Sequence, residues 1–408
     1  MDKSAKVLQP FVSRQSIYTR SVQLFAYELL YQRNVVEQAL LADSGNGTRE
    51  PFLKTFSDGL EELAGENLAF INIPRMFILQ DYCGVFPKER AILQISRDVE
   101  VDENIFRSLR TLSESGYKLA LDDFDCTEQN RPVLELANYL NLNFQRLTRD
   151  EMTNQLSTLS RSKAKAIASR VDTHEEFEMA KTMGFEYFRG SCFHKPKIPT
   201  PARIPINRLS TMQLVLKLQD PELSMVELEK IVSQDLAISY KLLRFVNSAA
   251  LSLTRNIESI KHAIQMVGTA RIRSWASLLL LTKLDDKPAE LLVTALVRAR
   301  MCEGLALAMG YQNPDSYHMV GLFSVVDALL NVTMPDAIQL LPFSRQVREA
   351  LVNHGGQMGS VLSCVLDYES GDWDDVRCGD LDAATIRQCY MDAISAAQKM
   401  PKGTDQDR

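Results

Sequence analysis

The feature that most constrains this chain is the proline-rich stretch at residues 194–208, which reads HKPKIPTPARIPINR. Proline fixes its φ angle and lacks an amide proton, so neither a helix nor a central strand can continue through the stretch. We therefore predict a linker at 194–208 between a first domain, residues 1–200, and a second, residues 201–400. A chain of 408 residues is long enough for both domains. The tail at 401–408 is predicted to be disordered.

Before the linker, short apolar runs alternate with helical patterns. The predicted strands lie at residues 23–31, 68–74, 91–96, 118–124 and 144–147, and the predicted helices at 50–65, 103–116 and 174–183. Strands that alternate with helices favour an α/β architecture with a mainly parallel sheet. Several of these strands end in polar residues, as a functional site at the carboxyl edge of a barrel requires.

After the linker, the apolar residues repeat with a period near 3.6, which predicts helices. Leu228, Val232 and Leu242 fit such a pattern. Ser224 precedes one predicted helix, and Glu227 follows three residues later, which is the pattern of a capping box. Because runs typical of strands nearly disappear, the second domain is predicted to be all-α.

Charge and cysteine content limit the possible partners and compartment. The net charge of −6 gives no overall positive field for nucleic acid, so nucleic acid is not expected as the primary partner. The seven cysteines show no C-x-x-C spacing and are predicted to be reduced. We find no apolar leader and no apolar run of about 18 residues, so we expect a cytoplasmic protein without a membrane span.

Four segments of the first domain, in the right order, resemble the EAL family of cyclic-di-GMP phosphodiesterases. They are RQSIYTRSVQLFAYELLYQ, FINIP, LALDDFD and MGFEYFRGSCFHKP, and the resemblance covers about residues 11–196. It implies a (β/α)8-type barrel. It also implies a site for Mg or Mn made by Glu28, Asn72, Asp122 and Asp123, and dinucleotide contacts from Arg14, Gln15 and Glu28. The adjacent Asp122 and Asp123 have a structural alternative, because acids at a strand end also cap the following segment.

Other positions depart from the pattern that the EAL family shows. The family's second glutamate ligand is Gln94 here, its Lys-x-Asp pair is Arg146 and Thr148, and another glutamate is Ser169. Arginine stays protonated and cannot act as a base, and threonine offers no carboxylate to a metal. Too few carboxylates remain to balance two divalent cations. The catalytic residues therefore stay unassigned. No cofactor is expected to be required, with a single Mg or Mn as the alternative.

The second domain resembles the HDOD family, most densely over about residues 205–285. Such modules are relatives of metal-dependent HD hydrolases that lack the histidine and aspartate ligands. In this chain Ser324 and Val325 stand where an HD hydrolase would carry that pair, and Asp327 comes too late. His318 lies in an apolar helical pattern and is predicted to be a core histidine. The resemblance implies protein–protein interaction rather than catalysis.

Three functional hypotheses remain open at this stage. The first is a signal-transduction protein with a catalytically degraded EAL domain, which regulates output such as motility or biofilm formation by binding other signalling proteins through its HDOD domain. The second is an active phosphodiesterase with a divergent site that converts cyclic-di-GMP to pGpG. The third is a receptor that binds cyclic-di-GMP without hydrolysis. A homodimer is compatible with each hypothesis.

Overall fold

The computed structural model describes residues 12–32, 59–197, 206–220, 222–247, 257, 259–281 and 287–398. Residues 198–205 of the predicted linker and the predicted disordered tail lie outside this part of the chain. Two compact units are present. The first contains Met1–Phe193, Leu366–Val376 and Asp382–Arg387, and the second contains His194–Val365, Arg377–Leu381 and Gln388–Arg408. Segments from the far end of the chain therefore belong to the first unit.

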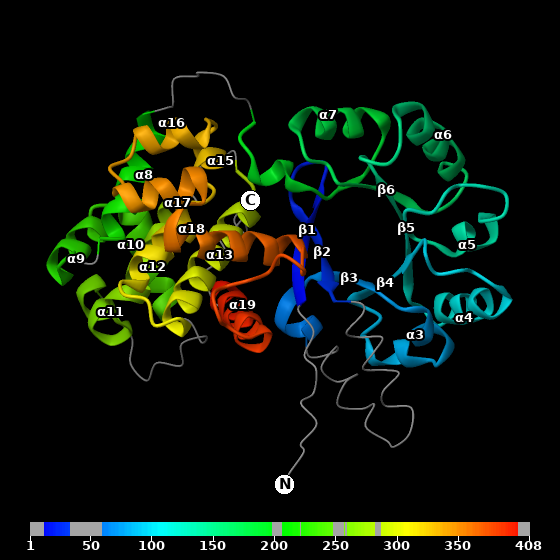
Figure 1. The fold of residues 1–408 in the computed structure, drawn as a ribbon, viewed down its shortest axis with the longest axis horizontal. Coiled ribbons are helices and arrows are strands. Elements are labelled where there is room, and N and C mark those ends of the chain that lie inside the picture. The colour runs from blue at the N-terminus through cyan, green and yellow to red at the C-terminus, as the bar shows by residue number, and fades with distance from the viewer. Residues whose placement is uncertain are drawn as a thin grey trace, which may run out of the picture. The chain divides into compact units, whose positions relative to one another are not determined.

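The first unit is a closed eight-stranded barrel (Figure 1). Its strands are β1 (Val12–Thr19), β2 (Leu24–Tyr31), β3 (Leu68–Asn72), β4 (Ala91–Ser96), β5 (Lys118–Asp122), β6 (Tyr139–Asn143), β7 (Lys165–Ser169) and β8 (Tyr187–Phe188). Strand β1 runs antiparallel to both of its neighbours, β2 and β8, whereas the consecutive pairs from β2 to β8 are parallel. The predicted barrel is confirmed. We call the end at which β2 to β8 finish the mouth.

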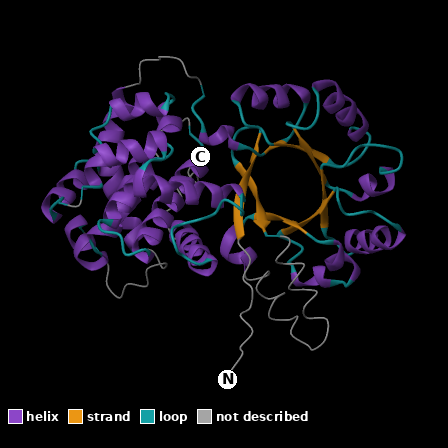
Figure 2. Ribbon diagram, in the orientation of Figure 1, coloured by secondary structure: helices purple, strands orange, loops and turns teal. Residues whose placement is uncertain are grey.

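Helices surround the ring of strands, as Figure 2 shows. They are α3 (Arg75–Leu79), α4 (Glu103–Glu114), α5 (Arg131–Leu136), α6 (Arg149–Leu159), α7 (His174–Met183) and the 3-10 helices η1 (Tyr82–Val85) and η2 (Ser191–His194). Capping boxes begin two of them: Thr148 with Glu151 opens α6, and Thr173 with Glu176 opens α7. Each box satisfies amide groups that a helix start would leave unpaired.

The inside of the barrel is filled by one continuous apolar layer. It consists of Ile17, Ala26, Phe70, Ile92, Ala120, Tyr139 and Ile167. Six of these seven residues are at most 1% exposed, and Tyr139 is 7% exposed. The interior is therefore a packed core below the mouth rather than a channel.

The strand predicted at residues 144–147 was wrong. The chain forms β6 at Tyr139–Asn143 instead, and it turns after Asn143, whose carbonyl accepts hydrogen bonds from the amides of Arg146 and Leu147. Phe144 made the later segment look like a strand, but its ring packs against Phe185. The true strand, β6, contains two asparagines, Asn141 and Asn143. It was not recognised because apolar residues are expected at most positions of a parallel strand.

The second unit is helical, as predicted. Its helices are α8 (Ile206–Leu218), α9 (Met225–Ser233), α10 (Leu236–Val246), α11 (Ile260–Val267), α12 (Thr269–Leu281), α13 (Ala289–Ala308), α14 (Pro314–Phe323), α15 (Val326–Leu330), α16 (Met334–Gln339), α17 (Arg345–Asn353), α18 (Gly356–Ser370) and α19 (Ala383–Gln398), the last two of which also extend into the first unit. Ser224 and Glu227 form the predicted capping box at the start of α9. None of the helices in the described part of the chain is both long enough and apolar enough to cross a membrane.

Helices α13 and α14 approach each other very closely at Gly321. A Cβ atom at this position would lie 2.4 Å from the carbonyl oxygen of Arg298 and 2.6 Å from the Cα of Ala299. Both are backbone atoms, so the helices themselves would have to separate. Gly304 on α13 differs, because a Cβ there would make an ordinary 3.4 Å contact with the sulfur of Cys389.

We expect Gly321→Ala to lower the free energy of unfolding by about 1–3 kcal/mol, the usual effect of overpacking a tight contact. Gly304→Ala is the matched control, since it also replaces a helical glycine but has room for the methyl group. It should be neutral or stabilise by up to about 1 kcal/mol through helix propensity. Urea denaturation of both variants measures the difference, and equal stability would contradict the proposed close contact.

Candidate functional site

A layer of polar side chains lies immediately above the apolar core, on the mouth side. Six of its residues each lie two positions beyond a core residue of the same strand. They are Glu28, Asn72, Gln94, Asp122, Asn141 and Ser169. Because side chains of a strand alternate between its two faces, all six project inward like the core residues below them. The barrel thus brings together three of the four predicted metal ligands, Glu28, Asn72 and Asp122, with Gln94 and Ser169.

Glu28 is the central acid of this layer, and it is only 2% exposed. One of its carboxylate oxygens accepts a hydrogen bond of 2.7 Å from the side-chain amide of Gln94. The other oxygen forms an ion pair with Arg189, which directly follows β8 and is itself largely buried. Burial lowers the pKa of Arg189 to about 10, so the guanidinium is still charged at neutral pH. The buried carboxylate is therefore balanced by a cation of the protein itself.

The network continues from Gln94 across two further strands. Asn141 on β6 donates from Nδ2 to the Gln94 oxygen at 2.9 Å and to an Asp122 oxygen at 3.1 Å. A chain of contacts thus runs from Arg189 through Glu28, Gln94 and Asn141 to Asp122. Asn141 is 1% exposed, so these hydrogen bonds are made in a largely dry environment where they are strong.

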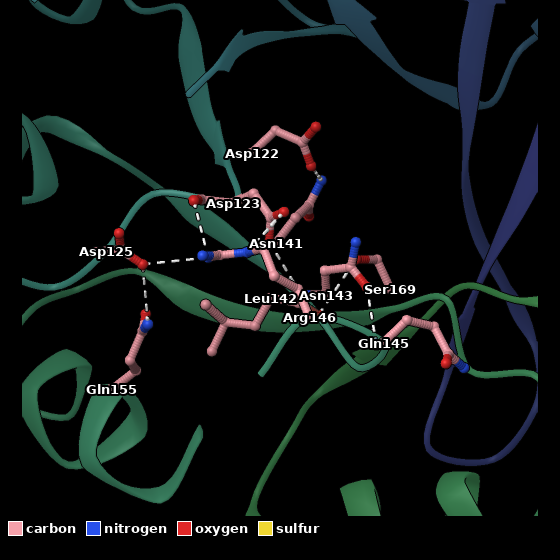
Figure 3. A network of polar contacts seen from close by, with 10 residues as sticks. All are labelled: Asp122, Asp123, Asp125, Asn141, Leu142, Asn143, Gln145, Arg146, Gln155 and Ser169. Carbon is pink, nitrogen blue, oxygen red and sulfur yellow. Dashed lines mark hydrogen bonds and ion pairs between the residues drawn. The ribbon is translucent and has the colours of Figure 1, made fainter. Parts of the chain in front are cut away.

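Asp123 points away from Asp122, as Figure 3 shows. Its backbone has a positive φ of 64°, which turns the side chain toward the loop after β6. There one oxygen accepts from the amide of Asn143 at 3.1 Å, and the other pairs with Arg146 at 3.1 Å. Arg146 also pairs with Asp125 at 3.1 Å. Burial lowers the pKa of Arg146, but Asp125 and Asp123 more than offset this, and the net shift is upward.

The residues that were predicted to contact a dinucleotide have partners within the barrel unit. Gln15 stands opposite Glu28 in the β1–β2 pairing, and its amide donates to the carbonyl of Ser370 at 3.3 Å. Arg14 projects to the other face of the strand. Its guanidinium donates to the carbonyl of Leu63 and lies 4.1 Å from the centre of the Tyr27 ring.

Of three further positions singled out in the sequence, Thr148 and Ser169 have evident structural roles, and Asn72 does not. Thr148 caps α6. Ser169 is 3% exposed and donates to the carbonyl of Leu142 at 3.2 Å. Asn72 ends β3 beside Gln94, and its side-chain oxygen is buried without a hydrogen-bond partner.

These contacts do not fit a two-metal centre. Both oxygens of Glu28 are engaged, and Asp122 and Asp123 turn to different partners. In the described part of the chain, no three histidine, cysteine, aspartate or glutamate side chains are arranged to hold a metal ion. Two divalent cations would also meet the fixed positive charges of Arg189 and Arg146, which raises the cost of placing them there.

A pocket of about 500 Å³ lies outside the polar layer, between the start of α4 and the loop after β5. Its lining includes five acids, Glu100, Asp102, Glu103, Asp123 and Asp125, and one base, Arg97. Phe106 and Phe124 contribute apolar surface. Three of these acids have counter-charges: Asp102 pairs with Arg75, and Asp123 and Asp125 pair with Arg146.

In the helical unit, Ser324 and Asp327 lie beside α13 rather than beside histidines. Arg298 of α13 donates to the hydroxyl of Ser324 at 3.2 Å. His318 is 5% exposed and its Nδ1 lies 3.0 Å from Glu303, so it is a core histidine with a partner, as predicted. Burial raises the pKa of Asp327 to about 6.

Sequence reasoning missed the two residues that complete the network, Arg189 and Asn141. Arg189 follows a strand of two residues, which is too short to show alternation. Asn141 was missed because the sequence predicted a strand at residues 144–147, whereas β6 spans Tyr139–Asn143. A signal was present nonetheless: Glu28 lies within an apolar strand, and a buried charge requires a partner.

Comparison with known proteins finds similar sequences and structures for both parts of the chain. Residues 204–354 match the family model described as the HDOD domain. The barrel is similar in fold to the EAL domain protein of Listeria monocytogenes EGD-e, with 16% identity, a TM-score of 0.36, and coverage of 45% of this chain and 87% of that one. A standalone EAL protein of Vibrio cholerae O395 has 19% identity and a TM-score of 0.34, with coverage of 47% and 92%. In this chain the closed barrel is thus followed by a segment, residues 204–354, that matches the HDOD domain.

Two curated relatives are similar over nearly the whole chain. The uncharacterized protein YuxH of Bacillus subtilis strain 168 is 29% identical over 95% of this chain and 98% of its own length. The cyclic di-GMP phosphodiesterase CdgJ of Vibrio cholerae serotype O1 (strain ATCC 39315 / El Tor Inaba N16961) is 29% identical over 94% of this chain and 91% of its own length. Both matches extend over the barrel and the helices.

Proposed function

We propose that this protein is a signalling module of the cyclic-di-GMP system whose barrel does not hydrolyse the dinucleotide. The observation that carries the proposal is the ion pair between Glu28 and Arg189. A metal would have to displace a charged guanidinium from the carboxylate, and it would find the other oxygen held by Gln94. No cofactor is required for such a role.

We infer that output passes through the HDOD domain. That domain would bind other signalling proteins and so regulate motility, biofilm formation or a similar response. The cluster at Ser324 supports a non-catalytic role, since Arg298 contacts the place where an HD hydrolase carries metal ligands. Whether the protein works as a homodimer is a separate question for sedimentation measurements.

The similarity to CdgJ favours a second candidate, hydrolysis of cyclic-di-GMP to pGpG with a divergent site. For that reaction, a metal would have to be held by Glu28, Asn72 and the two aspartates after rearrangement. The third candidate is a receptor that binds the dinucleotide without hydrolysis. A receptor ligand specific for the native state must raise thermal stability, which separates this candidate from a barrel that binds nothing.

We expect the purified full chain, incubated with cyclic-di-GMP and Mn, to leave the dinucleotide intact when products are followed by chromatography. Formation of pGpG that Asp122→Asn abolishes would contradict the proposal. This substitution suits the test because asparagine has nearly the same shape and keeps an oxygen to accept from Asn141. A combined Gln94→Glu, Thr148→Asp and Ser169→Glu variant should also remain inactive, because Arg189 and Arg146 still pair with Glu28 and Asp123.

A further inference from the structure

The segment Leu366–Val376 belongs to the barrel unit although it lies far from the barrel in sequence. It is strongly acidic, with Asp367, Glu369, Asp372, Asp374 and Asp375 and no basic residue. Tyr368 and Trp373 form an edge-to-face pair with ring centres 5.5 Å apart. Tyr368 has no exposed surface. We call this segment the cover.

Three hydrogen bonds join the cover to positions near the start of β1. The hydroxyl of Tyr368 accepts from the amide of Val12 at 3.4 Å. The hydroxyl of Ser13 donates to the carbonyl of Glu369 at 3.5 Å, and the side chain of Gln15 donates to the carbonyl of Ser370 at 3.3 Å. All three involve neutral groups and are long, so each contributes modestly.

The contacted side chains lie on the face of the β1–β2 pair that bears Glu28. Residues directly opposite each other in paired strands share a face. Ile17 stands opposite Ala26 in the barrel core, Gln15 opposite Glu28, and Ser13 opposite Leu30. The cover also touches Leu30, because a Cβ on Gly371 would lie 3.0 Å from its Cδ1. The cover thus occupies the end of this face that is nearest the mouth.

We propose that the cover blocks this face of the barrel. It must move away before another molecule can bind to Gln15. Two properties make it a competing occupant. Its hydrogen bonds to Val12, Ser13 and Gln15 place it on the mouth side of the face that a ligand would have to approach. Its acids repel an anionic ligand while it is in place, so the cover and a dinucleotide exclude each other. The choice of dinucleotide as the ligand rests on the proposed function, whereas the occupancy of the face rests on the contacts alone.

Tyr368→Phe in the full chain tests the cover, because it removes the acceptor for Val12 and keeps the ring. The matched control is Tyr390→Phe on α19, another tyrosine with 1% exposure. Because this hydrogen bond is long and weak, its loss should increase opening of the cover about twofold. Hydrogen exchange followed by mass spectrometry should show faster exchange in Val12–Gln15 and unchanged exchange in Lys165–Ser169. Unchanged exchange in both segments would overturn the proposal.

The second readout is the affinity for cyclic-di-GMP, measured by calorimetry on the same proteins. A cover that competes with the ligand predicts that Tyr368→Phe binds about twofold more tightly than the wild type, with Tyr390→Phe unchanged. Equal or weaker binding, or no binding by any of the three proteins, would overturn the competition. Appearance of pGpG would instead contradict the proposed lack of hydrolysis, so the two failures are distinguishable.

Discussion

Arg189→Met should lower the free energy of unfolding of the barrel by about 3–5 kcal/mol, because it leaves a buried carboxylate without its counter-charge. Glu28 is 2% exposed, so bulk solvent cannot stabilise its charge in place of the guanidinium. Glu28→Gln alone should cost a comparable amount, since Arg189 then lies largely buried and unpaired. Glutamine keeps an oxygen in the position that accepts from Gln94, so the rest of the network is preserved.

The double variant Glu28→Gln/Arg189→Met should recover most of the loss. Replacing a buried ion pair on both sides is often nearly neutral, whereas breaking it on one side is costly. The two single effects should therefore be strongly non-additive, with a coupling of at least about 2 kcal/mol. Additive effects would show that Glu28 and Arg189 do not depend on each other in the folded barrel.

The chain provides a reporter for each unit in these measurements. Of its two tryptophans, Trp373 belongs to the barrel unit and Trp275 to the helical unit. A Trp275→Phe background follows barrel unfolding alone, which matters because a protein of two units need not unfold in one step. Added Mn should leave the unfolding midpoint of the barrel unchanged in the protein that retains Arg189. A clear stabilisation by Mn would indicate a native metal site.

The parts of the fold that sequence predicted well are those governed by local signals. The helix predicted at 174–183 is α7 with the same limits, and the capping box at Ser224 formed as expected. Both features depend on residues a few positions apart, and the physical rule for each is simple. Glu28, Gln94 and Asp122 were singled out by the resemblance to the EAL family rather than by a local signal, and they lie in β2, β4 and β5.

The partners of those residues could not be predicted in the same way. Arg189 meets Glu28 only because the barrel closes between β8, β1 and β2, and no local pattern marks that meeting. Ser370 meets Gln15 from a segment that the sequence assigned to the helical domain. The direction of Asp123 depends on a positive φ that a pair of adjacent aspartates does not reveal. Closure of the barrel and the return of the Ser370 segment to it depend on residues far apart in the sequence. The direction of Asp123 depends on a backbone conformation that its sequence does not reveal.

The second large effect is expected at Asp327 in the helical unit. Burial raises its pKa from 3.8 to about 6, although the amide of Ala328 and the charges of Arg298 and Lys287 act in the opposite direction. Between these two values the native protein binds more protons than the unfolded chain, so stability falls as pH rises through this window. Above about pH 6 the full cost applies, on the order of 2–3 kcal/mol.

Asp327→Asn removes this cost, so the variant should be more stable than the wild type by about 2–3 kcal/mol at pH 7.5. The two unfolding curves should converge below about pH 4, where the aspartate is protonated in both states. Burial lowers the pKa of His194 to about 3, which destabilises both proteins alike as pH falls and so cancels in the difference. Asp380→Asn, at an exposed position, is the control and should stay within about 0.5 kcal/mol of the wild type.

The measurement is urea denaturation across pH in a Trp373→Phe background, where Trp275 reports on the helical unit. The result decides between two roles for the acid. If its charge were needed to balance Arg298, Asp327→Asn would be less stable at neutral pH, as Arg189→Met is expected to be in the barrel. A gain in stability would instead show that Ser324 and the other contacts of Arg298 stabilise its buried charge without Asp327. The charge on Asp327 would then lower the stability of the helical unit. Because strained or costly groups are kept mainly where they serve function, that outcome would direct mutagenesis of partner binding to α15.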